Sequence, residues 1–305
     1  MTDLICPSCR AALVESGAAL VCPQSHRWPL EGGIADFSGG RYYDQFDPSD
    51  ELQAAHLAGL DQEVDGSRRR IHDFYGPLLR KEGSPLRVLD SGCGNGISVD
   101  ILSDLGFEAW GNDLSALRKW QWRERRRRER LVVASTLSLP FPDGYFDAVL
   151  ASGVIEHIGV EEVGVPRYSV RACPDKELQR TAFVQELLRV LAPGGVLFLD
   201  APNGRFPIDF WHADAPGRPR WHRLDEGFLP SFAEVRRYVD AAAPAARVDA
   251  LSPYKRLQFR QTSRHWYGRL FAPAMEMFFR AMNAAPFRWL ARSPLNPFLV
   301  IRIRR

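Results

Sequence analysis

A glycine-rich run at residues 88–96 is the part of the sequence with the clearest chemical meaning. It reads VLDSGCGNG, so two apolar residues lead to an acid and then to three glycines at alternate positions. This pattern predicts a buried strand that enters a tight turn, where the backbone can lie against a ligand because no β-carbons intervene. Helical apolar spacing from Ile97 to Leu105 follows at once, so the turn aims its amide groups at whatever is bound.

An acid that follows the glycines indicates what the turn binds. A second short strand at residues 108–110 leads to Asp113, which lies 17 residues after Gly96. A nucleotide-binding βαβ unit places an acid near this position to hold ribose hydroxyls. The dinucleotide fingerprint would need glycine where Ile97 stands, and Asp90 suits an amine-bearing ligand better than a pyrophosphate.

Three cysteines and one histidine near the N-terminus have the spacing of a structural zinc site. Cys6 and Cys9 form a close pair, and an apolar hairpin at residues 12–21 separates them from Cys22 and His26. Tetrahedral Cys3His ligation closes the coordination shell and leaves no position for water. The chain has five cysteines, an odd number, and their clustering argues against a disulfide framework. We therefore predict a structural Zn²⁺ ion, in preference to four surface residues in a disordered tail or a zinc-free, redox-active Cys-x-x-Cys pair.

The motifs after residue 85 resemble those of the class I S-adenosylmethionine-dependent methyltransferases, with a core of the methyltransferase type 11 kind. They stand in the family's order: motif I at 90–96, LPFPDGYFD at 139–147, a strand at 148–152, GVIEH at 153–157, and a helix, Pro-Gly-Gly turn and strand at 188–199. The resemblance spans about residues 85–203. It implies an α/β fold, Rossmann-like and doubly wound, with a seven-stranded sheet whose last strand is antiparallel.

The resemblance also implies S-adenosyl-L-methionine as cofactor and assigns residues to it. Tyr42 or Tyr43 is the candidate to lie near the methionine carboxylate, with a plain core contact as the alternative. The other residues expected to contact the cofactor are Asp90, Gly92, Gly94, Gly96, Asp113, Leu114, Ser135, Thr136 and Ser152. The family often has Asp at the position of Ser135, where it binds the adenine amino group. Here we expect Ser135, or backbone groups near Thr136 and Leu137, to bind the adenine.

The cysteine-rich segment has resemblances of its own. Its CPxC and CPQxH pairs resemble the zinc domain of bacterial large-subunit rRNA guanine methyltransferases. The WPLEGGIAD stretch at 28–36 is similar to the turn of the small zinc ribbon in the tRNA-methyltransferase activator family.

The chain divides into three parts along the sequence. We expect a zinc ribbon at 1–38, a helical cofactor-covering segment at 39–84, and a methyltransferase domain at 85–305 with insertions at 204–229 and 252–297. Further expected elements are helices around 51–60, 67–80 and 231–239 and strands at 246–251 and 298–304. Both insertions should emerge at the carboxyl edge of the sheet, where ligands bind in such folds, and form the walls of an acceptor pocket.

Candidate catalytic residues follow from the chemistry of methyl transfer. The reaction is an in-line displacement, so a base is needed only when the acceptor must lose a proton, as a hydroxyl does. His157, after the fourth strand, is one candidate base, although Glu156 and His157 could simply order the loop. His212 and His222 in the first insertion are the alternatives. The histidines and acids of that insertion could also bind a metal, but their spacing there is irregular and not diagnostic.

Composition and charge patterns narrow the choice of partner. A net charge of +3 implies no large nucleic-acid footprint. The arginine-rich run at 123–130, expected on a helix, is better interpreted as a solvated face than as an RNA patch, and the Phe and Met stripe at 271–282 favours core packing over a membrane surface. No apolar stretch is long enough to span a membrane and no signal peptide is recognisable, so we expect a cytoplasmic protein.

The leading hypothesis is S-adenosylmethionine-dependent methyl transfer to a small-molecule, glycan or lipid-linked acceptor, at oxygen. The alternatives are an rRNA or tRNA base methyltransferase, which the ribbon and the arginine run favour, and a methyltransferase-like subunit that activates a partner. The intact glycine turn and Asp113 argue against a non-catalytic subunit.

Overall fold

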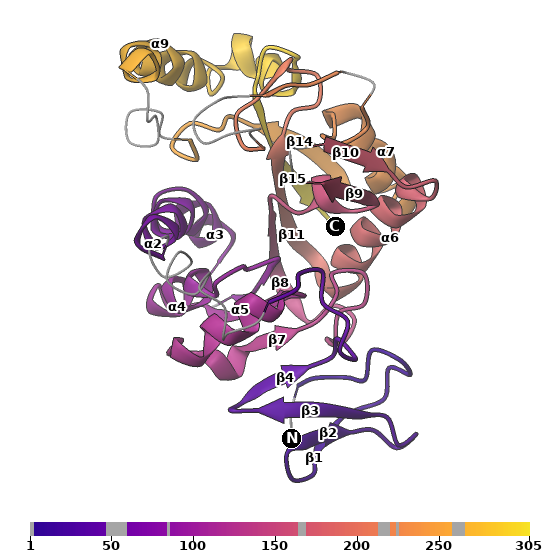
Figure 1. Ribbon diagram of the computed structural model, residues 1–305. Coiled ribbons are helices and arrows are strands. Elements are labelled where there is room, and N and C mark those ends of the chain that lie inside the picture. The colour runs from indigo at the N-terminus through magenta and orange to yellow at the C-terminus, as the bar shows by residue number, and fades with distance from the viewer. Residues whose placement is uncertain are drawn as a thin grey trace. The chain divides into compact units, whose positions relative to one another are not determined.

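The computed structural model describes residues 3–46, 60–83, 86–163, 169–212, 220–223, 226–257 and 266–305. The chain forms two compact units: unit 1 comprises Met1–Ala151 and Glu186–Leu197, and unit 2 comprises Ser152–Gln185 and Phe198–Arg305 (Figure 1). Most of the helix expected at 51–60, and the insertion acids Asp214 and Asp225, lie outside the described residues.

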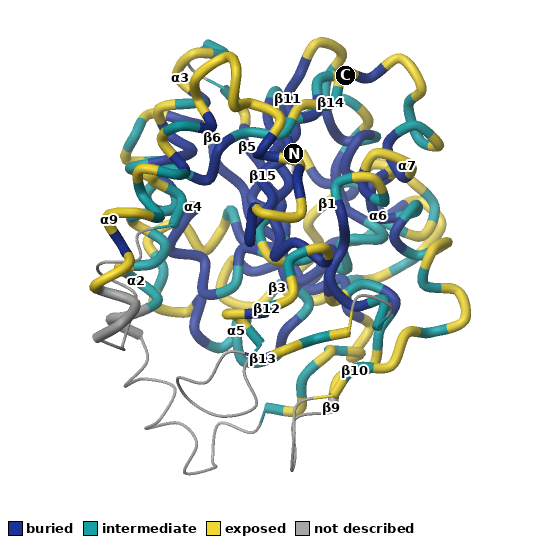
Figure 2. The backbone as a smooth tube through the Cα atoms, turned by 90° about the horizontal axis from the view of Figure 1, so that it is seen from above, coloured by how far each residue is buried: buried dark blue, intermediate teal, exposed yellow. Residues whose placement is uncertain are grey.

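Parallel strands form the centre of unit 1. They are β5 (Arg87–Ser91), β6 (Glu108–Asp113), β7 (Leu131–Val133) and β8 (Phe146–Ser152), and β5 pairs in parallel with both β6 and β8. Their residues are almost continuously apolar and buried, as a parallel sheet covered on both faces requires, and β5 and β6 are mainly dark blue in Figure 2. The strand ends therefore carry Asp90 and Asp113 on a rigid, buried support.

The order of the strands confirms the predicted fold class. The sheet runs β7-β6-β5-β8-β11-β15-β14, where β11 is Leu191–Pro202, β14 is Arg247–Leu251 and β15 is Phe298–Arg304. The last strand of the chain, β15, is antiparallel to β14, with Leu251 opposite Val300. This is the expected Rossmann-like seven-stranded core, and β8 and β11 each run through the boundary between the units.

The cysteine-rich segment adds four strands to the edge of this core. They are β1 (Val14–Glu15), β2 (Ala19–Val21), β3 (Arg27–Glu31) and β4 (Ile34–Asp36), paired antiparallel in sequence order. Strand β4 then pairs in parallel with β7, so the sheet has 11 strands among the described residues rather than seven. The backbone N–H and C=O groups at the edge of β7 gain hydrogen-bond partners in this way. The periodicity of the sequence could not reveal this pairing.

Helices of unit 1 surround the glycine turn. They are α2 (Leu60–Arg68), the π-helix η1 (Arg69–Tyr75), α3 (Gly76–Glu82), α4 (Ile97–Asp104) and α5 (Ala116–Gln121). The expectation that the arginine run at 123–130 lies on a helix is wrong. The chain there forms only the 3₁₀ turns η2 (Trp122–Glu124) and η3 (Arg128–Arg130), because Trp122 turns into the core and the consecutive like charges disfavour a helix.

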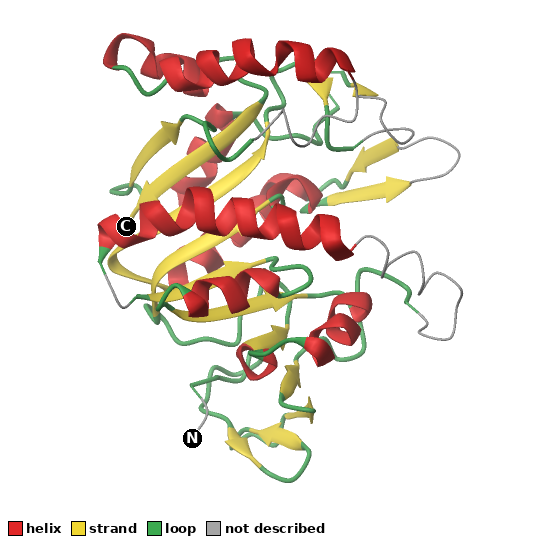
Figure 3. Ribbon diagram, turned by 90° about the vertical axis from the view of Figure 1, so that its left-hand side faces the viewer, coloured by secondary structure: helices red, strands yellow, loops and turns green. Residues whose placement is uncertain are grey.

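Unit 2 combines long helices with two small hairpins. Its helices include α7 (Phe232–Ala242) and α9 (Trp266–Ala281), and two 3₁₀ segments are η4 (Ile155–His157) and η5 (Ala285–Arg292). One hairpin pairs β9 (Val160–Val163) with β10 (Ser169–Ala172). The other pairs β12 (Ile208–Asp209) with β13 (Arg220–Trp221). Helix α6 (Lys176–Val190) crosses from unit 2 into unit 1. Helix α9 appears in red at the top of Figure 3. None of the described helices is long and apolar enough to cross a membrane.

The Phe and Met stripe of α9 divides between core and surface. Met282 packs with Phe279 and Leu290 in a small core of unit 2, as predicted. Phe271 is 62% exposed and Met277 is also exposed, so the same prediction is wrong for Phe271. Unit 2 thus presents large apolar side chains to its surroundings along α9.

Candidate functional site

The glycine turn has the geometry that its sequence predicts. Gly92, Gly94 and Gly96 all have positive φ, at 79°, 56° and 76°, a region that side chains with a β-carbon rarely adopt. A β-carbon on Gly96 would lie 2.7 Å from Leu131 Cδ1, whereas the nearest atom to one on Gly94 is Arg118 Nε at 3.9 Å. Gly96 therefore permits close packing, and Gly94 leaves open space above the backbone.

Asp113 is bound directly to this turn. Its Oδ2 accepts a hydrogen bond from Gly94 N at 2.9 Å and its Oδ1 accepts one from Leu114 N at 2.8 Å. The indole of Trp122 donates to Gly94 O at 2.8 Å and holds the other side of the turn. Burial raises the pKa of Asp113, and the amide hydrogen bonds act in the opposite direction. The turn and the acid form one preorganised piece, with Leu114 as part of it.

Asp90 faces a cation supplied by the protein itself. Arg70, from η1, lies 2.6 Å from Oδ2 and 3.3 Å from Oδ1 of Asp90, and Ser98 Oγ donates to Oδ2. Sequence reasoning missed Arg70. The only available signal was the basic residues in the segment expected to cover the cofactor.

The start of the covering segment is fixed at α5. Asp44 accepts hydrogen bonds from Ser115 Oγ at 2.6 Å and from Ala116 N at 2.7 Å, so it caps this helix, a role that the sequence did not suggest. Tyr42 donates its hydroxyl proton to Asp36 at 2.6 Å. Tyr43 is 69% exposed, and its N–H donates to Leu114 O at 3.2 Å. Of the two tyrosines, Tyr43 is the one with its ring exposed beside the Asp113 turn.

Ser135 and Thr136 lie in the turn that follows β7. Ser135 Oγ accepts a hydrogen bond from Leu137 N at 3.2 Å, and Ala134 N donates to Asp113 O at 2.9 Å. The next residues of the LPF motif are anchored by Glu186, which accepts from Leu139 N at 2.7 Å. The motif therefore serves to hold this turn against the end of α6, next to the strand that carries Asp113.

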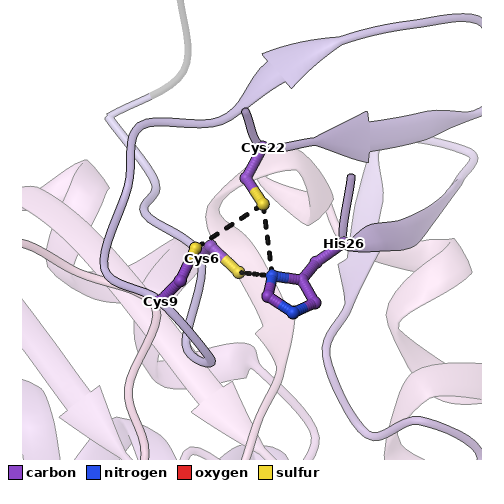
Figure 4. A group of neighbouring side chains, drawn as sticks. All are labelled: Cys6, Cys9, Cys22 and His26. Carbon is purple, nitrogen blue, oxygen red and sulfur yellow. Dashed lines mark hydrogen bonds between the residues drawn. The ribbon is translucent and has the colours of Figure 1, made fainter. Parts of the chain in front are cut away.

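The four zinc-ligand candidates form a single cluster in unit 1 (Figure 4). Their donor atoms all lie within 4.8 Å of one another. His26 Nδ1 is 3.5 Å from Cys6 Sγ and 3.3 Å from Cys22 Sγ, and Cys9 Sγ is 3.6 Å from Cys22 Sγ. Donors on a tetrahedral zinc ion lie about 3.5–3.8 Å apart, given bonds of about 2.3 Å to sulfur and 2.0 Å to nitrogen. The donor set and its spacing fit Zn²⁺.

The surroundings of Cys6 favour its thiolate form. Burial acts to raise the pKa of Cys6, but hydrogen bonds from the Trp28 indole and from backbone amides outweigh it and lower the pKa to about 6. Trp28 Nε1 lies 3.4 Å from Cys6 Sγ. Metal ligation requires the thiolate form, so this environment favours metal binding.

A second cluster in unit 2 brings together two of the three histidine candidates. Donor atoms of Glu156, His157 and His212 lie within 4.8 Å of one another, and the two imidazole centroids are 5.2 Å apart. His157 Nδ1 is 2.5 Å from Glu162 Oε1, and His212 Nδ1 is 3.0 Å from an oxygen of Asp209. The position of Glu162 was not predicted, whereas Asp209 is one of the insertion acids considered above as metal ligands together with His212.

His222 lies apart from this cluster. Its Nε2 is 2.6 Å from Phe206 O and its Nδ1 is 3.2 Å from Arg223 O, so backbone carbonyls face both ring nitrogens. This arrangement favours a structural role for His222 over base catalysis.

Ser152 belongs to a polar network at the start of unit 2. Its hydroxyl donates to Asp200 Oδ1 at 2.7 Å, and Arg256 donates to Asp200 Oδ2 at 2.8 Å and to Ser152 Oγ at 2.9 Å. Asp200 is fully buried. The network joins the ends of β8 and β11 to the second insertion.

Comparisons with known proteins agree with this geometry. Residues 89–199 match the family model described as a methyltransferase domain. The chain is 31% identical over 162 residues to the 2-methyl-6-phytyl-1,4-hydroquinone methyltransferase of Synechocystis, covering 50% of this chain and 43% of that protein. It is 30% identical over 147 residues to a probable S-adenosylmethionine-dependent methyltransferase of Mycolicibacterium smegmatis, covering 48% of this chain and 49% of that protein.

A third relative is matched over more of its length. The fatty-acid O-methyltransferase of Mycolicibacterium smegmatis is 27% identical over 208 residues, covering 64% of this chain and 69% of that protein. The chain spans about half the length of the first two relatives. Residues 89–199 therefore match a methyltransferase domain, and the second of these relatives is a probable S-adenosylmethionine-dependent methyltransferase.

Proposed function

We propose that this protein transfers the methyl group of S-adenosylmethionine to a small-molecule, glycan or lipid-linked acceptor, at an oxygen atom. The observation that carries the proposal is the hydrogen bond between Gly94 N and the buried carboxylate of Asp113, in a domain that matches methyltransferases. It joins a glycine turn open to a ligand with an acid suited to hydroxyl groups.

The residues of the turn fit the cofactor. Gly92, Gly94 and Gly96 would let its backbone approach, Asp113 would accept hydrogen bonds from the ribose, and Ser135 or Thr136 would lie at the adenine. When bound, S-adenosylmethionine supplies an electrophilic methyl group on a sulfonium. Asp90 would then contribute negative charge near a cationic ligand, shared with Arg70 at 2.6 Å.

Unit 2 holds the groups that could handle an acceptor hydroxyl. His157 is paired with Glu162 at 2.5 Å, which orients the imidazole in the manner of a base supported by a carboxylate. Hydrogen bonding and the charges of Glu162 and Glu156 raise the pKa of His157, although burial, the largest single influence, acts to lower it. This favours proton uptake by the ring. His212 is the second candidate in the same cluster.

Two observations support a lipophilic acceptor. The relatives named above include methyltransferases for a phytyl hydroquinone and for fatty acids. Unit 2 also exposes large apolar side chains, among them Phe210, Trp221, Phe271, Met277 and Trp289. Where exposed apolar side chains form a contiguous patch, they commonly mark a binding surface.

We further propose that the cysteine-rich cluster binds a structural Zn²⁺ ion through Cys6, Cys9, Cys22 and His26. Four donors are the number that a closed tetrahedral zinc shell needs, so the ion would stabilise the ribbon and would not contact an acceptor.

An RNA base acceptor is the second candidate, and the exposed arginines at 123–130 are the observation in its favour. Several of these arginines have partners within the protein: Arg126 pairs with Asp104 at 2.7 Å, and Arg130 lies 4.7 Å over the Trp110 ring. Such contacts reduce the charge that is available to phosphates.

Titration calorimetry with S-adenosylmethionine tests the cofactor site. Asp113→Ala and Gly94→Val should each weaken binding at least about 100-fold, because they remove a charged acceptor and force a side chain into a left-handed backbone. Asp104→Ala, at an exposed acid on α4, is the matched control and should bind as the wild type does. Unchanged affinity in both site variants would refute the assignment.

Transfer from methyl-labelled cofactor into host extract identifies the acceptor. The extract is separated into RNA, lipid-soluble and polar small-molecule fractions after incubation with the wild type and with Asp113→Ala. Label in a small-molecule or lipid fraction, absent from the variant, is the expected result. Label in RNA would replace the leading proposal with the alternative, and no label in any fraction would favour a non-catalytic partner subunit.

A further inference from the structure

Glu156 is a buried residue whose carboxyl group lacks a hydrogen bond at one of its oxygens. The residue is 2% exposed, and its Oε2 has no hydrogen-bond partner among the described residues. An ionised oxygen in such a place is unfavourable unless a cation neutralises it. Its two imidazole neighbours, His157 and His212, each offer a donor atom within 4.8 Å.

Both imidazoles are oriented from behind by carboxylates. His157 Nδ1 lies 2.5 Å from Glu162, and His212 Nδ1 lies 3.0 Å from Asp209. Histidines that bind metals usually donate the proton of one ring nitrogen to a carboxylate, which fixes the tautomer and strengthens the other nitrogen as a ligand. With Nδ1 turned to a carboxylate in each ring, Nε2 would be the coordinating atom.

The supports of this cluster are themselves held in place. Asp209 is fully buried and accepts hydrogen bonds from Trp211 N at 2.9 Å and His212 N at 3.1 Å. Arg180, also fully buried, donates to Glu156 O at 3.0 Å and to Phe228 O at 2.6 Å.

Phe228 in turn packs against both imidazole rings, with centroids 5.9 Å from His157 and 4.7 Å from His212. The three donors are therefore fixed by packing and hydrogen bonds from several segments of unit 2, which distinguishes the cluster from a chance group of exposed acids.

We propose that Glu156, His157 and His212 bind a divalent first-row transition-metal cation such as Mn²⁺ or Zn²⁺. Two imidazoles and one carboxylate are a known ligand set for such cations, and three protein ligands leave positions open for another molecule. The open positions suit an oxygen atom of an acceptor, and with the cation bound His157 and His212 would act as its ligands in place of the base role proposed above. Binding of the cation stands by itself, whereas this role toward the acceptor rests on the proposed function.

Direct measurement of Mn²⁺ binding tests the site. The full-length protein is loaded with zinc at the ribbon, freed of other metals, and titrated with Mn²⁺ alone, with the free ion followed by electron paramagnetic resonance. Mn²⁺ prefers nitrogen and oxygen ligands and competes poorly for a thiolate site, so the ribbon does not obscure the result. We expect one saturable site in the wild type.

Four variants locate the site on the chain. Glu156→Gln, His157→Ala and His212→Ala should each weaken Mn²⁺ binding at least about 10-fold, and Glu162→Gln about 10- to 100-fold through the imidazole that it supports. His222→Ala removes an imidazole of the same insertion that lies outside the cluster and should bind as the wild type does. Circular dichroism melts identify any variant that fails to fold, and Glu162→Gln, which keeps all three ligands, then decides the question.

The Mn²⁺ titration contains neither cofactor nor acceptor, so its outcomes test the metal site separately from the proposed function. No saturable Mn²⁺ binding, or equal affinity in all variants, would overturn the metal site whatever the enzyme methylates. Mn²⁺ binding that is lost in the three ligand variants establishes it even if no fraction of an extract takes label. Label transfer that is unaffected by removal of the metal would leave the site standing and overturn its role toward the acceptor.

Discussion

The two histidine-containing clusters differ in the donors that they offer. The cluster in unit 1 has three thiols and one imidazole, the number of donors that a tetrahedral shell needs, and the cluster in unit 2 has one carboxylate and two imidazoles. The first set suits zinc in a closed shell, and the second suits a harder cation with positions left open. A closed shell can only stabilise a fold, whereas an open one can take part in chemistry.

The neighbours of the donors differ in the same way. Cys6 receives a hydrogen bond from the neutral Trp28 indole, which stabilises a thiolate without adding charge. His157 and His212 face the carboxylates of Glu162 and Asp209, which add negative charge around a cation that has only one anionic ligand. The surroundings of each cluster thus compensate for the charge of its own ligands.

Loss of a ribbon ligand should have the largest effect on stability. Cys22→Ser should lose the zinc ion and roughly 5 kcal/mol or more of unfolding free energy, because structural zinc contributes directly to folding. Since β4 pairs with β7, the loss should extend to the sheet that carries Asp113. Urea denaturation and metal analysis by plasma mass spectrometry measure the two effects.

Cys173→Ser is the matched control for that change. Cys173 is a partly exposed free cysteine of unit 2, and its substitution should leave the urea midpoint and the zinc content unchanged. Equal midpoints for Cys22→Ser and the wild type, with the zinc gone, would mean that the ribbon does not need its metal.

Residues next to the ligands should have smaller effects, and they sharpen the contrast between the clusters. Trp28→Phe removes the donor to Cys6 but keeps a ring against Phe37, which lies 5.5 Å from the indole. Asp209→Asn removes the charge behind His212. We expect Zn²⁺ affinity to fall about 10-fold in the first variant and Mn²⁺ affinity about 10- to 100-fold in the second. Chelator competition measures both, and weaker binding of the ribbon's Zn²⁺ in Asp209→Asn would contradict the separation of the two sites.

Features encoded by local sequence were predictable. The positive φ of Gly94 and the strand that ends at Asp113 follow from short patterns, and so does the Cys and His spacing of the ribbon. Such patterns depend on neighbours in the chain, whose geometry is fixed by backbone sterics.

Features that depend on distant partners were not predictable. Arg70 meets Asp90, and Asp44 caps a helix that begins 72 residues later. Long-range pairs of this kind have no spacing rule. Glu162 is only 5 residues from His157, yet it reaches the imidazole because the chain turns back into the β9–β10 hairpin. The helix expected at the arginine run failed because burial of Trp122 outweighed helical propensity.

Low pH should destabilise the contact between the zinc ribbon and the sheet, because the carboxyl of Asp36 becomes protonated. Burial acts to raise the pKa of Asp36, but hydrogen bonds from Lys119, Ser38 and Tyr42 outweigh it and lower the pKa. A carboxyl with a lowered folded-state pKa stabilises the fold above its unfolded value, near 3.9, and this contribution is lost as pH falls through the folded value. Asp36→Asn should therefore cost about 2 kcal/mol at pH 7, and the difference from wild type should shrink below about pH 4.

Urea titrations of both proteins between pH 3 and pH 7 measure that difference. Asp104→Asn is the control, because this acid is exposed and pairs only at the surface with Arg126. A difference for Asp36→Asn that stayed constant across the range would show that ionisation of Asp36 does not support this contact.

Glu156→Gln should produce the smallest effect, and unlike the effects of the ribbon variants its size should depend on Mn²⁺. Glutamine has the same shape without the buried charge, so without Mn²⁺ the variant should be more stable than the wild type by about 1–2 kcal/mol. At about 100 times the wild-type dissociation constant, Mn²⁺ should stabilise the wild type by about 2.7 kcal/mol and a variant with 10-fold weaker binding by about 1.4 kcal/mol, so the advantage of the variant should shrink by about 1.3 kcal/mol or more. Urea denaturation of zinc-loaded protein with and without Mn²⁺ measures this change. An advantage that stayed the same would show that Mn²⁺ does not stabilise the protein through Glu156, because a cation held by this carboxylate must stabilise the wild type more than the variant.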